Sequence, residues 1–195
     1  MSQKLITLFQ DLKKAYGPRH WWPADTRFEV IVGALLTQNT AWSNVERAIG
    51  NLRSGRLLSV RQMSKVSETR LASLIRPAGY FNVKAHRLKN FLNFLHLKYR
   101  GRLNELLDQP LPFLREELLS VNGIGPETAD SIILYAAGKP IFVVDAYTKR
   151  VFSRIGILSS SASYTDTQKY FMDNLPLDAR LFNEFHALIV EHAKR

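Results

Sequence analysis

The sequence predicts an all-α fold, and three observations carry that prediction. Apolar side chains recur at helical spacing along nearly all of the 195 residues, and short Gly/Pro turn signals separate these stretches. Only Ile141 to Val144 has the character of a strand, but this segment is short and has no partner strand in the sequence. With 46% hydrophobic residues the chain can bury a core on folding, which excludes an intrinsically disordered protein.

The elements follow in order from this periodicity. Residues 5–12 form the first expected helix, and residues 28–36 form a second one that is apolar on most faces and is therefore expected to be buried. The loops are short, and no internal repeat is present. The remaining expected helices cover residues 44–52, 68–75, 83–99, 103–107, 111–119, 126–136, 144–155, 164–174 and 179–194.

The charge balance predicts a polyanionic partner. Lys plus Arg number 27 against 17 Asp plus Glu, which gives a formal net charge of +10. Between Thr69 and Asn104 the chain has eight Lys or Arg and no acid. A solvated helix face would explain the cations alone, but the complete absence of acids favours contact with phosphates, because each neutralised phosphate releases counterions. Nucleic acid is the expected partner.

The sequence also limits where the protein is expected in the cell and which cofactors it can bind. Residues 1–17 have neither an 18-residue apolar run nor the order of a signal peptide, so we expect a cytoplasmic, nucleoid-associated bacterial or archaeal protein that is not secreted and binds no membrane. The chain has no cysteine, which excludes a disulfide framework, a thiolate nucleophile and a Cys-ligated iron–sulfur cluster within these residues. The five histidines lack metal-ligand spacing, and no metal site is expected.

Residues 118–135 predict a helix, a glycine hairpin and a second helix with Pro126 in its first turn. Two glycines allow the backbone to approach a ligand closely, and the first N–H groups of the second helix then point at an anion. A tight turn between packed helices is the alternative interpretation. The segment resembles the helix-hairpin-helix motif of DNA repair glycosylases, whose hairpin amides hold a DNA phosphate. The resemblance implies DNA contacts by Gly123, Ile124, Gly125 and Thr128.

A carboxylate, Asp145, follows at the start of a helix and directly after an apolar stretch. Capping of that helix would by itself explain an aspartate there. Together with the hairpin and a Gly/Pro loop, the Val-Asp-x-x-x-x-Arg pattern resembles the superfamily named for helix-hairpin-helix, Gly/Pro loop and catalytic Asp. That superfamily includes endonuclease III, the adenine glycosylases and the 3-methyladenine glycosylases. The resemblance implies catalysis by Asp145 and DNA contacts by Lys149 and Arg150.

Two upstream segments extend the resemblance to about residues 25–155. Residues 28–42 resemble the early buried helix of the superfamily with its glutamine loop, and residues 79–85 resemble its G-x-x-N-x-K-A loop. The resemblance implies that Gln38 fills the gap left by a flipped nucleotide and that Tyr80 wedges the opposite strand, which offsets the cost of unstacking. Further DNA contacts are implied for Asn39, Asn82 and Lys84.

The resemblance also implies a two-lobed architecture. Residues 26–149 would form a central helical domain with the hairpin, and residues 1–25 plus 150–195 would form the other domain. The active site is expected in the cleft between the two lobes.

Position 127 departs from the bifunctional members of the superfamily. In those members a lysine stands four residues after the first hairpin glycine and attacks the sugar, whereas this chain has Glu127 there. A carboxylate cannot form a Schiff base. The sequence therefore predicts a monofunctional glycosylase in which water is the nucleophile and ionised Asp145 stabilises the cationic sugar or activates the water.

All three tryptophans lie close to the buried second helix in the sequence. Core packing would explain any one of them. The Trp-Trp-Pro segment and the Gln-Asn-Thr loop with its following aromatic resemble the 3-methyladenine glycosylases of the endonuclease III-like group, in which aromatic rings sandwich the extruded base. Alkylated purines are cationic, and a cation over an indole gains about 0.5 to 2 kcal/mol. The implied base pocket contains Trp21, Trp22, Pro23, Trp42 and Lys194.

The expected function is therefore a monofunctional DNA glycosylase of base excision repair that excises alkylated purines such as 3-methyladenine. It would act as a monomer on double-stranded DNA containing a damaged base, without a cofactor. Two alternatives stay open: an adenine-mismatch or other base glycosylase of the same fold, and a non-catalytic protein that binds damaged DNA. Asp145 favours catalysis, because a carboxylate near the sugar would repel phosphate and bring nothing to a pure binder.

Overall fold

The structure of the chain, a computed structural model, describes residues 3–195. Every regular element within that range is helical, which confirms the all-α prediction. Two compact units form: unit 1 runs to Pro23 and resumes with Ile133–Arg195, and unit 2 is Ala24–Ile132. None of the described helices is long and apolar enough to cross a membrane.

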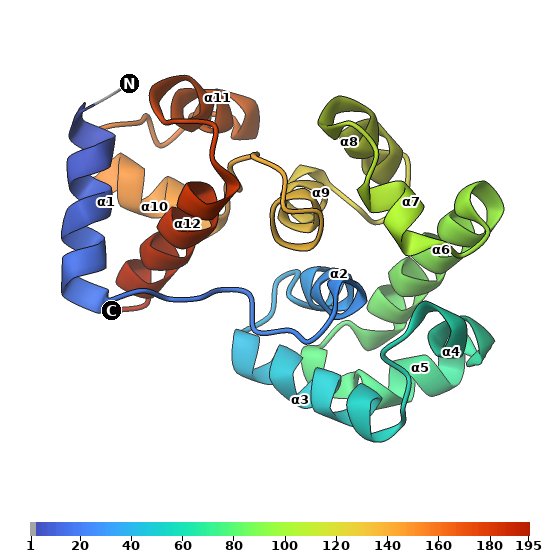
Figure 1. Cartoon of the computed structure of the whole chain (residues 1–195). Coiled ribbons are helices and arrows are strands. Elements are labelled where there is room, and N and C mark those ends of the chain that lie inside the picture. The colour runs from blue at the N-terminus through green and yellow to red at the C-terminus, as the bar shows by residue number, and fades with distance from the viewer. Residues whose placement is uncertain (1–2) are drawn as a thin grey trace. The chain divides into compact units, whose positions relative to one another are not determined.

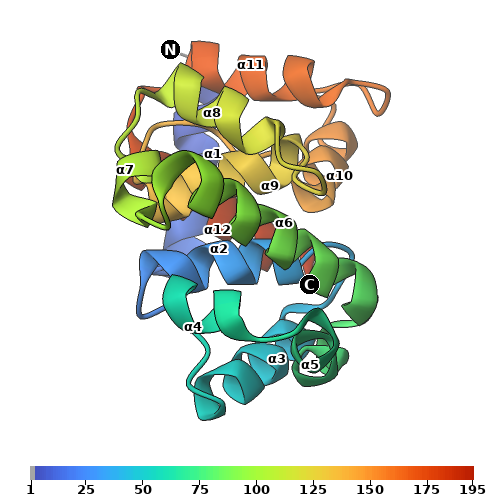
Figure 2. The same ribbon diagram turned by 90° about the vertical axis from the view of Figure 1, so that its right-hand side faces the viewer.

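Unit 2 is built around α2 (Arg27–Leu36), whose residues from Phe28 onward are all buried, as the apolar pattern predicts. Thr26 caps this helix by accepting a hydrogen bond from the backbone N–H of Glu29. In the ribbon views α6 is the long helix of this unit (Figures 1 and 2). The other elements of unit 2 are α3 (Trp42–Ser54), α4 (Val60–Lys65), α5 (Glu68–Leu74), η1 (Arg76–Ala78), α6 (Phe81–Tyr99), α7 (Leu103–Leu107), α8 (Leu111–Leu119) and α9 (Pro126–Ser131).

The short helix α4 was not among the helices predicted from the sequence. Six residues are too few to display a helical period, so apolar spacing cannot detect it. A capping signal was nevertheless present, because Ser59 accepts a hydrogen bond from the backbone N–H of Gln62.

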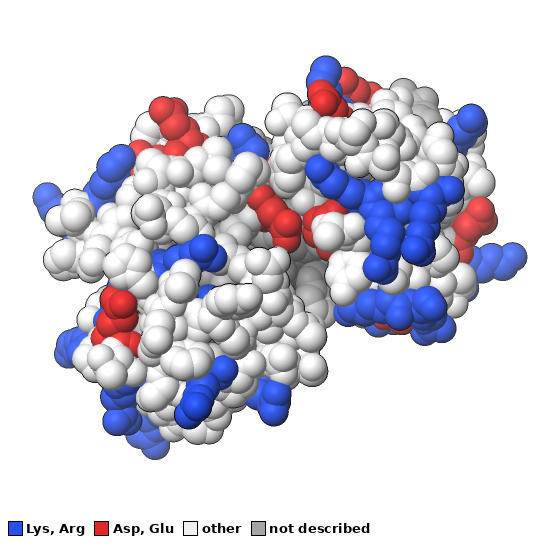
Figure 3. Space-filling view, turned by 180° about the vertical axis from the view of Figure 1, so that it is seen from behind, with Lys and Arg blue, Asp and Glu red and all other residues white. Residues whose placement is uncertain are grey.

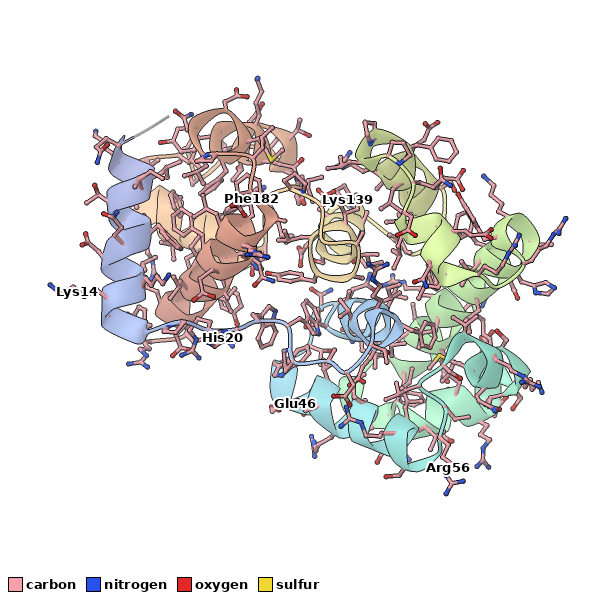
Figure 4. The ribbon with its side chains drawn as sticks, viewed as in Figure 1. Lys14, His20, Glu46, Arg56, Lys139 and Phe182 are labelled. Atoms are coloured by element: carbon pink, nitrogen blue, oxygen red, sulfur yellow. The ribbon has the colours of Figure 1, made fainter. Side chains whose placement is uncertain are left out.

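Unit 1 contains α1 (Gln3–Tyr16), α10 (Ala146–Arg154), α11 (Tyr164–Asn174), α12 (Ala179–Ala193) and all but the first residue of η2 (Ile132–Ala136, a π-helical turn). Helix α12 packs against both α1 and α10 (Figure 1). The core of unit 1 is aromatic. The Phe142 ring stacks on the Phe171 ring with centroids 3.9 Å apart, and the Phe182 and Phe185 rings meet Phe142 edge-on. Figure 4 labels Phe182 on the α12 side of this core.

The second boundary between the units lies earlier than the predicted residue 149. Residues 133–149 belong to unit 1 because Phe142 is fixed there by its ring stacking and by Gln168, whose side chain donates to the Phe142 carbonyl at 2.7 Å. The apolar stretch from Ile141 to Val144 is buried but forms no strand in the described chain, as the sequence predicts. It leads the backbone directly into α10.

Candidate active site

Asp145 occupies the N-cap of α10, with extended backbone angles (φ −107°, ψ −179°). Its Oδ1 accepts two hydrogen bonds from Thr148, one from the backbone N–H at 2.7 Å and one from the hydroxyl at 2.8 Å. The four preceding apolar residues are buried and anchor the backbone at this point. One carboxylate oxygen, Oδ1, therefore serves the helix cap, and the second oxygen, Oδ2, takes no part in it.

Two further side chains, one of them distant in sequence, complete the surroundings of Asp145. His186 on α12 places Nε2 at 3.6 Å from Asp145 Oδ2, and its Nδ1 is 2.6 Å from the hydroxyl of Tyr135 in η2. Sequence reasoning missed both residues, because it weighed His186 only as a metal ligand. The available signal was its place between Phe185 and Ala187 on the buried stretch of the last helix, where a polar residue needs a partner.

The surroundings of Asp145 and Tyr135 determine their charge states. Burial raises the pKa of Asp145, but positive charge on His186 and the Thr148 hydrogen bonds outweigh it, so the pKa lies below its usual 3.8 and the group is ionised. Burial, then the charges of Asp145 and Glu184, raise the pKa of Tyr135 well above its usual value. Tyr135 thus remains a hydroxyl that is hydrogen-bonded to Nδ1 of His186, while Nε2 of the same ring faces the Asp145 carboxylate.

Aromatic rings continue from this group toward the predicted base pocket. The ring centroids of Trp22 and Tyr135 are 5.1 Å apart, and those of Trp21 and Trp22 are 5.3 Å apart. Both tryptophans are half-buried and belong to unit 1, whereas Trp42 begins α3 in unit 2 and is also half-buried. The structure thus brings Trp22 into the surroundings of Asp145.

The other two residues of the predicted pocket are exposed. Pro23 is the last residue of unit 1 before the chain enters unit 2, and Lys194 is the C-cap of α12. Their roles at a base remain sequence predictions.

Lys84 requires a correction. The sequence places it on DNA, but it is only 2% exposed, and its Nζ donates to the carbonyls of Leu36 and Ala78, each at 2.8 Å, and to the Thr40 hydroxyl at 2.7 Å. Burial, then the charge of Arg87, lowers its pKa to about 8. A lysine with three protein acceptors is unable to reach a phosphate, so Lys84 joins the loop after α2 to the loop before α6.

Gln38 and Thr128 are also used inside unit 2. The Gln38 amide donates to the Gly123 carbonyl at 3.1 Å and to the Thr128 hydroxyl at 2.9 Å, and its oxygen accepts from Arg87. The Thr128 side chain is buried, and a DNA contact by this residue stays a prediction. Gln38 here braces the hairpin, and insertion into DNA would require these bonds to break.

The hairpin between α8 and α9 has the predicted glycine geometry. Gly123 has φ +96°, and a Cβ there would lie 2.3 Å from Cγ of Arg87, so both conformation and space require glycine. Ile124 is 5% exposed and anchors the turn in the core. Gly125 has extended angles, is exposed and has open space around its Cα, which leaves its backbone accessible to a ligand.

Three of the predicted DNA-contacting residues project outward from unit 2. Tyr80 is 73% exposed and lies at the N-cap of α6 with left-handed angles (φ 44°, ψ 34°). Asn39 is exposed with φ 52°, and Asn82 is exposed in the first turn of α6. Non-glycine residues in this backbone region are strained, a feature that concentrates at functional sites. Their geometry suits the predicted wedge, whose function stays a prediction.

The two predicted basic contacts on α10 hold other parts of unit 1. Lys149 Nζ donates to the Ala162 carbonyl at 3.0 Å, and Arg150 donates to the Ala193 carbonyl and covers the Tyr147 ring at 5.2 Å. Figure 3 shows basic side chains gathered in blue clusters on one face of the molecule, where acidic ones are fewer. Within residues 3–195 no group of three or more potential His, Asp or Glu metal ligands occurs.

Known proteins share this sequence and structure. Residues 32–177 match the family described as "HhH-GPD superfamily base excision DNA repair protein". The chain is 50% identical over 195 residues to the "Putative DNA repair glycosylase MJ1434" of Methanocaldococcus jannaschii, covering 99% of this chain and 88% of that protein. It is 27% identical over 175 residues to endonuclease III of Sulfolobus acidocaldarius, covering 86% and 73% of the two chains.

Among solved structures, the chain superposes on the H. pylori 3-methyladenine DNA glycosylase (MagIII) bound to 1,N6-ethenoadenine with a TM-score of 0.83. The identity is 30%, and the match covers 98% of this chain and 94% of that one. The structure of a non-covalent endonuclease III–DNA complex gives a TM-score of 0.82 at 22% identity, covering 96% and 83%. At that identity the second likeness concerns the fold.

Proposed function

Since the chain belongs to the HhH-GPD superfamily of base excision DNA repair proteins and is a DNA glycosylase of that family, we propose that it hydrolyses the glycosidic bond of alkylated purines. The observation that carries this proposal is Asp145, which is ionised and holds Oδ2 outside the helix cap. An ionised carboxylate stabilises a sugar that develops positive charge and accepts a proton from water.

We propose further that the reaction is monofunctional. Glu127 is exposed in the first turn of α9, at the position that carries the lysine nucleophile in the strand-cleaving members of the superfamily. Without an amine at that position, water attacks C1′ of the deoxyribose. The bond from C1′ to the purine nitrogen breaks with its electron pair going to the base, and Asp145 takes the proton released by the water.

Alkylated purines fit the aromatic side of the site. Methylation at N3 or N7 makes the base cationic and weakens its glycosidic bond, so that little general-acid assistance is needed from a site with one central carboxylate. The Trp21 and Trp22 rings lie next to each other, and contact between a cation and an indole ring is favourable. The H. pylori relative, a 3-methyladenine glycosylase bound to 1,N6-ethenoadenine, supports the same substrate class.

The proposed partner is double-stranded DNA with a damaged base, bound by a monomer at the nucleoid, where such an enzyme meets its substrate. Strand contacts come from the backbone at Gly125 and from the outward-facing Tyr80, Asn39 and Asn82. The chain has no cysteine to ligate an iron–sulfur cluster, and we propose that its chemistry requires no cofactor.

Base release from dimethyl-sulfate-treated DNA tests this function. Chromatography should detect free 3-methyladenine or 7-methylguanine, and the strand should break at the abasic site only after hot alkali. Mock-treated DNA and duplexes with uracil or an A·G mismatch serve as controls. Release of adenine from the mismatch alone would favour the mismatch glycosylase, and tight binding of damaged DNA without any released base would favour the non-catalytic binder.

A further inference from the structure

We propose that His186 is a second residue of the reaction centre, which holds the attacking water together with Asp145. This inference rests on the proposed hydrolytic function and extends it to a side chain on α12. The proposed role belongs to the Nε2 atom of His186, which faces Asp145 Oδ2. In this role Nε2 contacts the reacting water.

The His186 Nε2 atom is polar, buried and without a hydrogen-bond partner within residues 3–195. The His186 side chain is 9% exposed, and its distance of 3.6 Å to Asp145 Oδ2 is too long for a normal hydrogen bond. Buried polar atoms in native proteins almost always have a partner, and one without a partner in the chain is explained by a catalytic role or by a bound water or ion. The geometry therefore points to a partner from outside the chain, located next to the ionised carboxylate.

Water matches the chemistry of the two facing atoms. A ring nitrogen that faces an ionised carboxylate is favoured as an N–H donor, and Oδ2 is an acceptor, so one water molecule can accept from Nε2 and donate to Oδ2. These two bonds use one lone pair and one O–H of the water and leave its other lone pair for the sugar. A general base is effective when it lies within hydrogen-bond reach of the proton that it removes.

His186 and Asp145 are each held in position by hydrogen bonds to the ring nitrogen and the carboxylate oxygen that do not face each other. Tyr135 is 2.6 Å from Nδ1 and fixes the orientation of the ring, and Thr148 binds Asp145 Oδ1 and fixes the carboxylate. The Tyr135 ring in turn contacts Trp22. Two atoms fixed in this way define a direction for the water before the substrate binds, which is the arrangement that accelerates a hydrolytic step.

The step balances without a further reactant. As the bond between C1′ and the purine breaks, the base leaves with the electron pair and becomes neutral. The water oxygen forms a bond to C1′, its proton passes to Asp145 Oδ2, and His186 keeps its own proton throughout. The carboxyl group then loses the proton to solvent, which restores the ionised state that its low pKa favours.

The experiment compares three variants on α12. His186→Leu removes the donor, His186→Gln restores an N–H of similar reach, and His192→Leu is the matched control, since His192 also bonds a tyrosine, Tyr16 at 2.8 Å. Single-turnover excision under saturating enzyme reports the chemical step, and binding to an abasic-site analogue reports affinity. We expect a fall of about 100-fold for His186→Leu, at most about 10-fold for His186→Gln, and none for His192→Leu, with affinities within about threefold.

Each contrary outcome overturns the inference. Wild-type rates in His186→Leu would exclude a role in the step, and equal losses in the folded Leu and Gln variants would exclude the N–H donor. If His186→Leu does not fold, Tyr135→Phe replaces it, because loss of the hydroxyl that orients the ring should slow excision about 10-fold, and an unchanged rate would contradict the proposal.

The substrate for these rates is chosen from a panel of methylated-purine, uracil and mismatch duplexes. Release of uracil alone would refute the proposed substrate class while leaving the His186 test to run on uracil. Failure of the proposed function and failure of the His186 inference are thus distinguished.

Discussion

Lys84 in unit 2 and Asp145 in unit 1 are ionisable side chains with opposite surroundings. Lys84 in unit 2 donates to three protein oxygens at 2.7 to 2.8 Å. Asp145 in unit 1 binds its helix cap through Oδ1, while Oδ2 faces the His186 ring at 3.6 Å. A charge with every partner inside the protein holds structure together, whereas a charge with an uncommitted atom is available for chemistry.

The surrounding residues repeat this contrast. In unit 2 the Gln38 amide and Arg87 brace the hairpin, and the exposed Tyr80, Asn39 and Asn82 are uncharged. In unit 1 the partners of Asp145 arrange one carboxylate oxygen and one ring nitrogen around a common point. We therefore propose that unit 2 holds the DNA and that unit 1 carries the reaction centre.

The largest effect should come from Asp145→Asn. Asparagine still caps α10, so the fold should persist, but loss of the negative charge should lower single-turnover excision by about 10³-fold or more, with DNA affinity retained or improved. Because the pKa of Asp145 lies below 3.8, the wild-type rate should show no acid limb from this group above about pH 4. A rate that falls with an apparent pKa near 6 would assign the acid limb to another group.

Lys84→Met tests the holding role in unit 2. Removing the ammonium leaves three buried or half-buried oxygens without their donor, so the free energy of unfolding should fall by about 2 to 3 kcal/mol, measured by urea denaturation. The salt dependence of DNA binding should not change. Arg70→Gln, in the exposed part of the same basic stretch, is the control, and it should reduce the log–log salt slope by about one if Arg70 touches a phosphate. The reverse pattern would restore Lys84 as a DNA contact.

Gly125→Ala should weaken binding to damaged and intact duplex alike, by about 10-fold, because the added methyl group stands where backbone amides meet a phosphate. Its fold should be unaffected, since a Cβ there has open space. Gly123→Ala is the contrasting variant: with φ +96° and Arg87 in contact, it should lower the melting temperature. Equal affinities of wild type and Gly125→Ala would remove the hairpin from the DNA interface.

The smallest effect concerns pH. The pKa of Lys84 is lowered to about 8 in the folded protein, against about 10.4 for an unfolded chain, so between these values the unfolded state binds more protons. Stability should therefore rise with pH across this window, by about 1 kcal/mol relative to Lys84→Met, in urea titrations at pH 8 and pH 10. Parallel stability curves for the two proteins would show that Lys84 titrates at its ordinary value.

Sequence patterns predicted what depends on local chemistry. The buried α2 follows from its apolar faces, and Asp145 as the N-cap of α10 follows from residue preference. The prediction that Lys84 contacts DNA was wrong, because a stretch rich in Lys and Arg does not indicate which of its cations is buried. Its spacing from Leu88, Phe91 and Leu95 on α6 places it on the apolar face, so the periodicity contained the correct answer.

Other features depend on contacts between distant segments. Tyr135 and His186 are separated by 51 positions, and their hydrogen bond exists only because η2 and α12 pack in one unit. The bond between Gln38 and Thr128 spans 90 positions. No spacing rule connects such pairs, so the positioning of the carboxylate and the bracing of the hairpin emerge only from the fold.

Borohydride trapping tests the central claim, hydrolysis by water at Asp145, most directly. The protein is incubated with its damaged duplex and with a preformed abasic duplex in the presence of sodium borohydride, beside an endonuclease III as positive control, and covalent products are separated by denaturing electrophoresis. Because Glu127 replaces the lysine nucleophile, free base should accumulate while no protein–DNA adduct forms. Efficient trapping of the unmodified protein, at a level near that of the control, would contradict the account.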